Sequence, residues 1–185
     1  SQTIPMTLQG IPAFYIHSFT ATPNDHVGVE QTMTTRAINR RRWDMGELNF
    51  LLRNPQNASS QVFDALRRRL QIRRMLKVLH PDIGQRALDL GPDLLGVCRE
   101  DGDKSLYMFA LHNITGYNKT LPLGQIHLPS KVGSWSDALT GETIDPQATD
   151  LAFEPYQTMW LVPQVDCPRP DPLISPTDAS KDPEE

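Results

Sequence analysis

One stretch decides the predicted fold: Gly10-Ile11-Pro12-Ala13-Phe14-Tyr15-Ile16-His17-Ser18. A Gly-x-Pro turn leads into a short apolar run that contains aromatic and β-branched residues. The length of this run and the turn before it favour a buried strand over residues 11–17. A lone strand cannot satisfy its own backbone hydrogen bonds, so this one must lie between neighbouring parallel strands. The stretch therefore predicts the last part of a larger sheet.

The composition limits the classes of protein that the chain can belong to. The chain has 185 residues, of which 38% are hydrophobic, with 16 prolines and 11 glycines. These numbers allow one domain, or one and a half, with many turns. We find neither the run of about 20 apolar residues that a membrane helix needs nor a signal peptide, and we expect no membrane association. Cys98 and Cys167 form neither a disulfide framework nor a metal set, so we expect a cytoplasmic protein without metal or cofactor.

The net charge of −4 hides an asymmetry along the chain. Residues 36–77 contain eleven basic and three acidic residues, whereas the part after Asp82 is acidic overall. A basic first part and an acidic second part predict two structural units with different surroundings.

The first half of the chain is predicted to contain a long loop and two helices. Residues 18–42 show neither a helical nor a strand period, and a loop of this length is usually functional or disordered. Asp44 is placed as the N-cap of a short helix with Glu47 at its third position, and Asn54-Pro55 ends that helix. A longer helix begins at Ser59 or Ser60 and stops before residues 80–81, because its apolar residues recur with a period near 3.6.

The second half is predicted to be a small antiparallel sheet or sandwich. Glycine-containing turns at residues 91–93, 101–103 and 140–142 separate short apolar runs. The predicted strands are 86–90, 94–99, 105–112, 120–123, 134–139, 151–153 and 158–162. After Pro163 the chain is rich in Pro, Asp and Ser and has little to bury, so we expect a disordered tail.

Several of these segments resemble one known family. The Gly10-Ile11-Pro12 turn and its strand are similar to the last strand of the catalytic barrel in the alpha-amylase superfamily. More specific segments resemble sucrose phosphorylase and its relatives, the glucosylglycerate and glucosylglycerol phosphorylases. These segments are residues 16–18 (Ile-His-Ser), 24–25 (Asn-Asp), 28–30 (Gly-Val-Glu), 36–40 (Arg-Ala-Ile-Asn-Arg), 88–92 (Leu-Asp-Leu-Gly-Pro) and 109–113 (Phe-Ala-Leu-His-Asn). The resemblance covers most of residues 10–162.

The resemblance implies an α+β fragment: the last strand, loop and helices of a (β/α)8 barrel, followed by a small antiparallel β C-terminal domain. Residues 1–81 would form the end of the barrel, 82–163 the β domain and 164–185 a disordered Pro/Asp-rich tail. Such a fragment needs the missing N-terminal barrel as its partner.

The resemblance also implies a reaction. Phosphorylases of this branch transfer a glucosyl unit from sucrose or a related glucoside to inorganic phosphate with retention, giving glucose 1-phosphate. Retention uses two carboxyl groups about 5 Å apart. Those carboxylates follow earlier barrel strands, so this chain holds no catalytic residue and is expected to be inactive alone.

The resemblance places one family functional residue in this chain. Arg36 matches a loop arginine that binds phosphate or the acceptor sugar, and a planar guanidinium suits phosphate oxygens. His17, Asn24 and Asp25 are the further candidates for substrate or phosphate binding. The chain departs from the family at Thr32-Met33-Thr34-Thr35-Arg36, where relatives often read Thr-Gly-Arg-Asn-Arg.

Each candidate has a structural alternative. Arg36 could pair with a local acid such as Glu30, and His17 could be held by neighbours behind the pocket. A loop carboxylate such as Asp25 is usually solvated or bonded to its own backbone. Asn39 and Arg40 would then brace the loop.

Two other classes of function stay open at this stage. The chain could be a free-standing carbohydrate-binding or interaction module, in which Trp135 and Trp160 stack on sugars rather than filling a core. The arginine-rich helix could bind nucleic acid, but no nucleic-acid motif accompanies it, and arginine stems commonly cover apolar surface. We expect no nucleic-acid partner, and we expect Cys98 to be buried and inert.

Overall fold

The computed structural model describes residues 2–129, 132–145 and 147–172. Packing divides the chain into two compact units. Unit 1 comprises Ser1–Pro12 and Arg69–Pro170, and unit 2 comprises Ala13–Arg68 and Asp171–Glu185. The division falls inside the long helix α4 (Ala58–Met75). It rests on packing alone, so the domain bounds expected from the sequence stay predictions.

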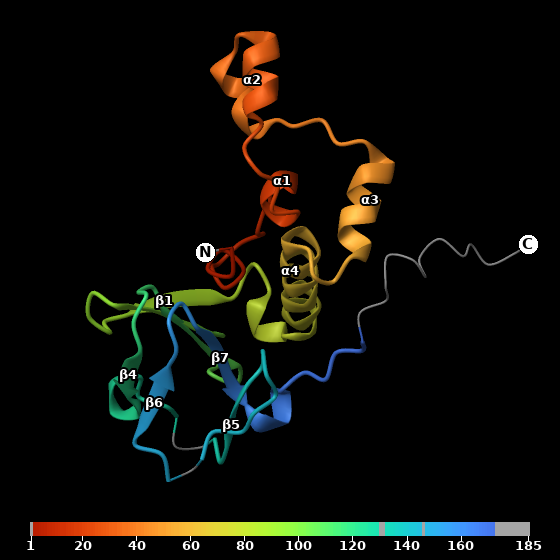
Figure 1. Ribbon diagram of the computed structural model, residues 1–185. Coiled ribbons are helices and arrows are strands. Elements are labelled where there is room, and N and C mark those ends of the chain that lie inside the picture. The colour runs from red at the N-terminus through yellow and green to blue at the C-terminus, as the bar shows by residue number, and fades with distance from the viewer. Residues whose placement is uncertain (1, 130–131, 146, 173–185) are drawn as a thin grey trace, which may run out of the picture. The chain divides into compact units, whose positions relative to one another are not determined.

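Unit 1 is built on antiparallel strands (Figure 1). Its main sheet has the order β1-β2-β3-β7-β5, and a second sheet pairs β4 with β6. The strands are β1 (Gly84–Leu88), β2 (Leu94–Glu100), β3 (Tyr107–Asn113), β4 (Lys119–Pro122), β5 (Trp135–Asp137), β6 (Asp150–Phe153) and β7 (Thr158–Pro163). Each overlaps a predicted strand, and the α+β class with an antiparallel sheet is confirmed.

The core of unit 1 explains why these strands form. All seven residues of β3 are buried, as expected for a central strand covered on both faces. On one face, Phe109 and Leu111 join the core to which Phe153 of β6 also belongs. Phe109 meets Trp135 edge to face, with 5.4 Å between the ring centroids. Trp160 is completely buried. Both tryptophans therefore lie in the core, as the structural alternative predicted.

The predicted turns of unit 1 are present, each with its own chemistry. Gly91 and Gly141 have positive φ angles of 80° and 82°, which glycine adopts without steric strain. Asp101 organises the β2–β3 turn by accepting hydrogen bonds from the backbone nitrogens of Ser105 (2.7 Å) and Leu106 (2.8 Å). These bonds favour the charged carboxylate and lower the pKa of Asp101.

A fully buried arginine joins separate segments of unit 1. Arg99, on β2, is 0% exposed and donates to four backbone carbonyls. The acceptors are those of Gly84 (3.1 Å), Thr7 (3.0 Å), His80 (2.9 Å) and Ile83 (2.7 Å). The guanidinium thus replaces its hydration shell with carbonyl oxygens. It ties the first residues of the chain to the sheet.

Unit 2 contains short helices: α1 (Ile16–Phe19), α2 (His26–Thr32), the 3₁₀ helix η1 (Thr35–Asn39) and α3 (Met45–Arg53). The strand predicted over residues 11–17 is wrong. Residues 11–15 have no regular structure, and α1 begins at Ile16. A parallel strand needs partners on either side, and the described residues supply none at this place, so the backbone closes hydrogen bonds locally instead.

Three further predictions for the helical half of the chain are tested by the structure. The loop predicted without period over residues 18–42 contains α2 and η1, so that prediction is wrong in part. The prediction for α3 is confirmed: Asp44 caps it by accepting from the Glu47 nitrogen at 3.0 Å, and the helix ends before Asn54. The long helix is confirmed as α4, which begins at Ala58, one residue before the predicted start, but its predicted end is wrong: α4 ends at Met75, and residues 77–79 form a 3₁₀ helix instead.

The end of the chain is described only as far as residue 172. Residues 164–166 form the 3₁₀ helix η4 (Gln164–Asp166), so they are ordered. Residues 167–172 of the predicted disordered tail are described and have no regular structure, and residues 173–185 lie outside the described residues. Two other short 3₁₀ helices are η2 (Lys77–Leu79) and η3 (Leu123–Gln125).

Candidate functional site

The predicted site residues lie on consecutive elements of unit 2. His17 is in α1, Asn24 and Asp25 precede α2, and Arg36 is in η1. Two hydrogen bonds hold these elements together. The Tyr15 hydroxyl donates to the Asn39 carbonyl at 2.8 Å, and the Asp25 nitrogen donates to the Ile38 carbonyl at 2.7 Å.

Arg36 presents its side chain to solvent. None of the ion pairs among the described residues involves Arg36, and the alternative pairing with Glu30 is not formed. The backbone that follows Arg36 is held by the bond from Tyr15 to the main-chain carbonyl of Asn39, and the predicted role of the Asn39 side chain stays a prediction. A guanidinium in this state keeps its donors available for an anion.

His17 is half-buried and belongs to a polar cluster (Figure 1 shows its helix, α1). Its Nδ1 lies 3.1 Å from the Thr22 hydroxyl oxygen, and its ring meets that of Tyr15 edge to face at 5.0 Å. The Trp43 indole nitrogen also donates to the Thr22 hydroxyl, at 3.0 Å, and the Thr20 hydroxyl lies 2.8 Å from it. These contacts fix the imidazole ring by one nitrogen only.

Sequence reasoning missed Thr22 and Trp43. They are 21 positions apart in the sequence and meet only because the chain folds back between α1 and α3. The Arg41 guanidinium lies 4.0 Å from the centroid of the Trp43 ring and pairs with Glu47 at 2.6 Å. An Arg-Arg-Trp run does not reveal such an arrangement. From the sequence alone, the charged residues 40–42 indicate a solvated surface. The structure instead places the Arg41 guanidinium over the indole ring.

Asp25 has a structural task in α2. Its carboxylate caps this helix by accepting from the Gly28 nitrogen at 2.8 Å. A Cβ at Gly28 would lie 2.3 Å from a carboxylate oxygen of Asp25, so any other residue there would force that carboxylate to move from its capping position. The capping alternative therefore describes Asp25, and its role as a ligand stays a prediction. Asn24, beside it, is exposed.

The family departure at Met33 has a structural correlate. Met33 follows α2 with φ 52° and ψ 29°, in the left-handed region. Glycine adopts this conformation freely, whereas other residues do so at a cost of about 1–2 kcal/mol. The family pattern quoted above has glycine at this position. The turn before η1 thus has a left-handed residue that is not glycine.

The chemistry available to this site is binding rather than bond cleavage. Arg36 offers paired donors, His17 offers its second ring nitrogen, and Asp25 is committed to a helix cap. In the described part of the chain, no group of three His, Cys, Asp or Glu residues could hold a metal ion. The site fits the binding of an oxyanion or a polyol.

Buried titratable groups lie away from this site, in unit 1. Burial lowers the pKa of His112 to about 4 and raises that of Cys98 to about 11. The Cys98 thiol is protonated at neutral pH, which confirms the prediction of a buried, unreactive cysteine. Burial also raises the pKa of Asp137, whose carboxylate accepts a hydrogen bond from the backbone nitrogen of Trp160 at 2.8 Å.

The arginines of α4 interact within the protein. Arg67 lies over the Phe63 ring at 5.5 Å and 3.6 Å from Asp64, and Arg68 donates to the Asp171 carbonyl at 2.8 Å. Arg73 donates to the carbonyls of Met6 and Gly10. These contacts favour the structural interpretation of the arginine-rich helix.

The chain was compared with known proteins. No family model matches it. It is 28% identical over 162 residues to a glucosylglycerate phosphorylase of Allomeiothermus silvanus, covering 88% of this chain and 26% of that protein. Glucosylglycerate phosphorylases of Spirochaeta thermophila and Escherichia coli are 25% and 23% identical, covering 90% and 87% of this chain and 30% and 27% of theirs. The chain thus spans less than a third of the length of the curated relatives that it matches.

Solved structures show the same partial match. The structure of AmyP in complex with maltose superposes with a TM-score of 0.64 at 12% identity, covering 87% of this chain and 33% of that one. The trehalulose synthase MutB of Pseudomonas mesoacidophila gives a TM-score of 0.55 at 15% identity, covering 87% and 37%. These similarities show the fold alone.

Together, the sequence comparisons confirm the resemblance to glycoside phosphorylases, over a part of their length. Within the described residues, the helices are all too short or too polar to span a bilayer.

Proposed function

We propose that this chain is the C-terminal portion of a glycoside phosphorylase that transfers a glucosyl unit from a glucoside to phosphate with retention, giving glucose 1-phosphate. The observation that carries the proposal is the sequence match to three glucosylglycerate phosphorylases over 87–90% of the chain. Sucrose or a related glucoside is the donor, and glucosylglycerate is the first one to assay. The two free cysteines suit a cytoplasmic enzyme.

In this proposal the chain contributes binding and not bond cleavage. Arg36 contacts phosphate or the acceptor, and His17, Asn24 and Asp25 are the further candidate ligands. The support for Arg36 is its exposure without an ion-pair partner among the described residues. The carboxylates that form and break the glucosyl bond lie in the preceding barrel, which the chain needs as its partner. Covalent transfer requires those groups and cannot proceed by positioning alone.

The experiment joins this chain to the barrel of a relative. The matching C-terminal part of the Allomeiothermus silvanus glucosylglycerate phosphorylase is replaced by these 185 residues, and glucose 1-phosphate is measured with glucosylglycerate or sucrose. We expect release by the fused protein and none by the 185-residue chain alone. Glucose 1-phosphate formed by the isolated chain would contradict the proposal.

A matched pair of variants tests the role of Arg36 in the fused protein. Arg36→Ala should raise the KM for phosphate by about tenfold or more, because a charge-assisted hydrogen bond to phosphate is lost. Arg53→Ala, in the last turn of α3, is the control and should leave the KM unchanged. Equal values for the two variants would remove Arg36 from the phosphate site.

A further inference from the structure

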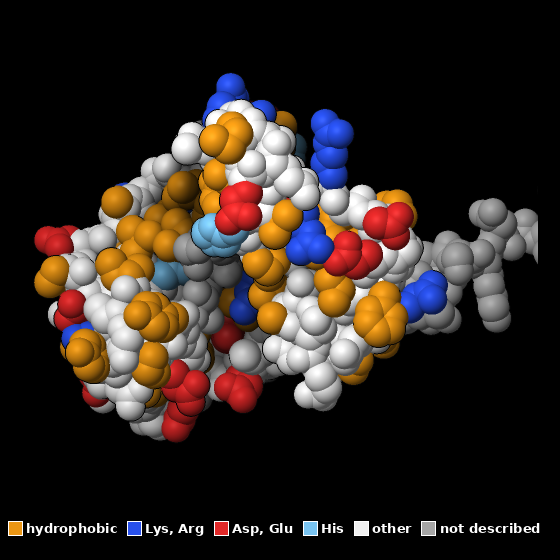
Figure 2. Space-filling view, turned by 45° about the horizontal axis from the view of Figure 1, so that its top comes forward, with side chains coloured by type: hydrophobic (Ala, Val, Ile, Leu, Met, Phe, Trp, Pro, Cys, Tyr) orange, Lys and Arg blue, Asp and Glu red, His pale blue; other side chains and the backbone are white. Residues whose placement is uncertain are grey.

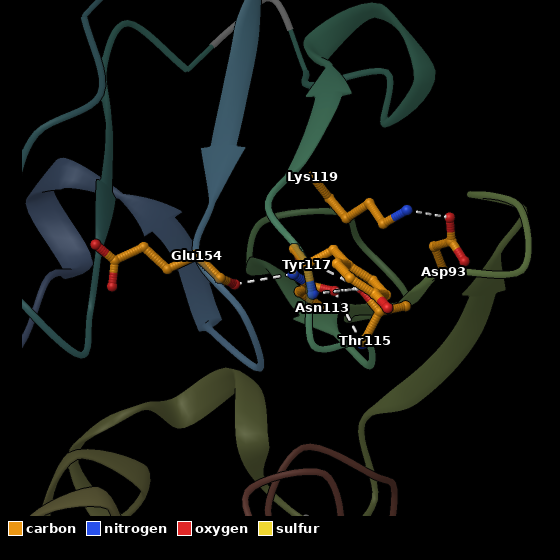
Figure 3. Close-up of polar contacts among 6 residues, drawn as sticks. All are labelled: Asp93, Asn113, Thr115, Tyr117, Lys119 and Glu154. Atoms are coloured by element: carbon orange, nitrogen blue, oxygen red, sulfur yellow. Dashed lines mark hydrogen bonds and ion pairs between the residues drawn. The ribbon is translucent and has the colours of Figure 1, made fainter.

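Two polar clusters of the chain differ in how completely their hydrogen bonds are paired. The first lies in unit 1 around Asn113, which is 3% exposed (Figure 3). Its amide nitrogen donates to the Tyr117 carbonyl at 2.7 Å and to the Glu154 carbonyl at 2.8 Å. Its amide oxygen accepts from the nitrogen and the hydroxyl of Thr115, at 3.0 and 2.8 Å. These bonds fill both donors and both acceptor positions of the amide, so this cluster holds loops together and offers nothing to a ligand.

The second cluster lies in unit 2 around the hydroxyl oxygen of Thr22 and is called here the threonine cluster. Four contacts define it. The Trp43 indole nitrogen donates to this oxygen at 3.0 Å, the Thr20 hydroxyl lies 2.8 Å away and the His17 Nδ1 lies 3.1 Å away. The Thr20 hydroxyl also lies 3.0 Å from the Ile16 carbonyl oxygen. These are hydrogen-bond distances, so each of the four contacts needs one proton.

The four protons can be assigned in one way. A carbonyl has no proton, so the bond between Thr20 and Ile16 uses the proton of the Thr20 hydroxyl. The bond between Thr22 and Thr20 then uses the proton of the Thr22 hydroxyl. The Trp43 indole supplies the third proton, since this group only donates. The fourth proton must come from His17, so its Nδ1 is protonated and donates to the Thr22 oxygen.

This tautomer determines what the second ring nitrogen of His17 can do. In a neutral imidazole one nitrogen carries the proton and the other accepts, so Nε2 has a free lone pair. Within the part of the chain that the structure describes, no hydrogen bond reaches Nε2, and the ring is only half-buried beside Tyr15. A lone pair attracts the proton of a hydroxyl group and repels the negatively charged oxygens of phosphate. The ring is therefore prepared to bind a hydroxyl group.

We propose that His17 accepts a hydrogen bond from a hydroxyl group of the glucoside and takes no part in binding phosphate. Thr22 and Thr20 are positioning residues, because they keep the imidazole proton on Nδ1 and thereby keep Nε2 an acceptor. The identity of the ligand rests on the proposed function, whereas the tautomer rests on the four contacts alone. Arg36 has only donors and His17 presents an acceptor, so the two side chains recognise different parts of the substrates.

The first measurement is the tautomer of His17 in the 185-residue chain. The chain is labelled with ¹⁵N-histidine, and two-bond ¹H–¹⁵N correlation spectra at about pH 8, where an ordinary imidazole is neutral, identify the protonated nitrogen of each ring. The variant His17→Gln assigns the His17 signals by their loss. We expect the proton on Nδ1. A proton mainly on Nε2, or the tautomer mixture of a histidine in an unstructured peptide, would overturn the proposal.

Removal of a hydroxyl that does not touch the imidazole ring tests the positioning role. Thr20→Val leaves the Thr22 proton without its acceptor, so this proton can turn to Nδ1 and the imidazole proton should move to Nε2. Thr20→Ser keeps the hydroxyl and should keep the proton on Nδ1. Thr32→Val is the matched control, because the Thr32 hydroxyl donates to the Gly28 carbonyl at 2.7 Å within α2. An unchanged tautomer in folded Thr20→Val would contradict the proposal, and if this variant does not fold, the tautomer of the unaltered chain decides.

The ligand is tested with inorganic phosphate and with the kinetics of the fused protein. Phosphate at about 50 mM should leave the ¹⁵N shift of the His17 Nε2 unchanged, and a saturating change would overturn the assignment. In the fused protein, His17→Phe should raise the KM for glucosylglycerate about fivefold or more and change the KM for phosphate less than about twofold, because only a bond to a hydroxyl is lost. Arg36→Ala should affect the KM for phosphate instead. A raised KM for phosphate in His17→Phe would place His17 at the phosphate.

The two kinds of measurement fail separately. The tautomer and the phosphate titration need no glucosyl transfer, so a negative result there leaves the phosphorolysis by the fused protein untouched. If the fused protein releases no glucose 1-phosphate, the proposed function fails, and the NMR spectra still decide whether His17 presents an acceptor and avoids phosphate.

Discussion

Unit 1 and unit 2 bury their apolar residues to very different extents. In the described residues of unit 2, Leu52 and Leu66 are the buried hydrophobic side chains, whereas the remaining core residues belong to unit 1. Both units expose some large apolar side chains, and Figure 2 shows hydrophobic side chains at many points of the visible surface, but in unit 2 the exposed ones outnumber the buried ones. These exposed residues of unit 2 are Tyr15, Ile16, Val27, Met33, Met45 and Phe50.

The difference teaches which part of the chain is complete. Unit 1 closes its own core between two sheets and satisfies its turns, so it has the properties of an independent domain. In unit 2, side chains cap the N-termini of α2 and α3, but few apolar residues are buried. Most helical stability comes from tertiary packing. It has the properties of a segment that folds against a partner, which agrees with the proposed barrel.

The largest expected effect concerns the buried arginine of unit 1. Arg99→Ala removes the donor to four backbone carbonyls, one of them that of the buried Thr7, and creates a cavity where the buried side chain was, so the free energy of unfolding should fall by about 3–5 kcal/mol. Urea denaturation followed by tryptophan fluorescence measures this change, because Trp135 and Trp160 report on the same unit.

The matched control is Arg86→Ala on the neighbouring strand β1. Arg86 is largely exposed and lies 4.0 Å from Glu100, so its loss should change the free energy of unfolding by about 0.5 kcal/mol or less. Similar losses for Arg86→Ala and Arg99→Ala would show that the buried guanidinium does not hold unit 1 together.

The next effect is a pH dependence that belongs to unit 1. His112 is buried, and its folded pKa of about 4 lies below the ordinary value of 6.5. Only the unfolded chain takes up the proton between these values, so stability is fully present above pH 6.5 and is lost as the pH falls towards 4. The loss should reach about 3 kcal/mol.

The variant His112→Gln removes this titration and should flatten the fall between pH 6.5 and 4.5, as measured by urea denaturation at each pH. His127→Gln is the control, because His127 is exposed and its replacement should leave the slope unchanged. An unaltered slope in His112→Gln would contradict the assignment to His112.

A smaller effect tests the cap of α2 in unit 2. Gly28→Ala drives a methyl group onto the Asp25 carboxylate and should destabilise α2 by about 1–2 kcal/mol. Gly46→Ala is the matched change in α3, where the new methyl would lie 3.1 Å from Asp44, and the better helix propensity offsets the contact. Amide hydrogen exchange of α2 and α3 measures both, and faster exchange in α3 alone would reverse our account of the two caps.

The smallest effect is a gain in stability. Met33→Gly relieves the left-handed conformation and should slow amide exchange in α2 by an amount equivalent to about 1 kcal/mol. The gain is partly offset by the greater freedom of glycine in the unfolded chain. Faster exchange in this variant would mean that Met33 stabilises the turn through contacts of its side chain.

The sequence predicted unit 1 well, because its strands alternate with turns that have their own residue signals at Gly91, Asp101 and Gly141. It predicted α3 from the Asp44 cap. It could not predict the role of Arg99, since all four of its acceptors are backbone carbonyls and carry no side-chain pattern. It failed over residues 11–17 because a β-prone run forms a strand only where neighbouring strands accept its hydrogen bonds.

For the candidate site, the sequence identified the residues but not their surroundings. The cap formed by Asp25 could have been predicted, because Gly28 lies three positions later in the sequence. We interpreted these residues as part of a family motif instead. The contact of His17 and Trp43 with one threonine depends on how the chain returns from α3, which local sequence does not specify.

Amide hydrogen exchange over the whole 185-residue chain compares the two units most directly. We predict that amides of β2, β3 and β7 are the slowest to exchange, whereas those of α2, η1 and α3 exchange with little protection, because their segment has almost no core. Protection of α2 and α3 equal to that of the sheet would show that unit 2 is complete in itself, and would contradict its assignment as part of a larger barrel.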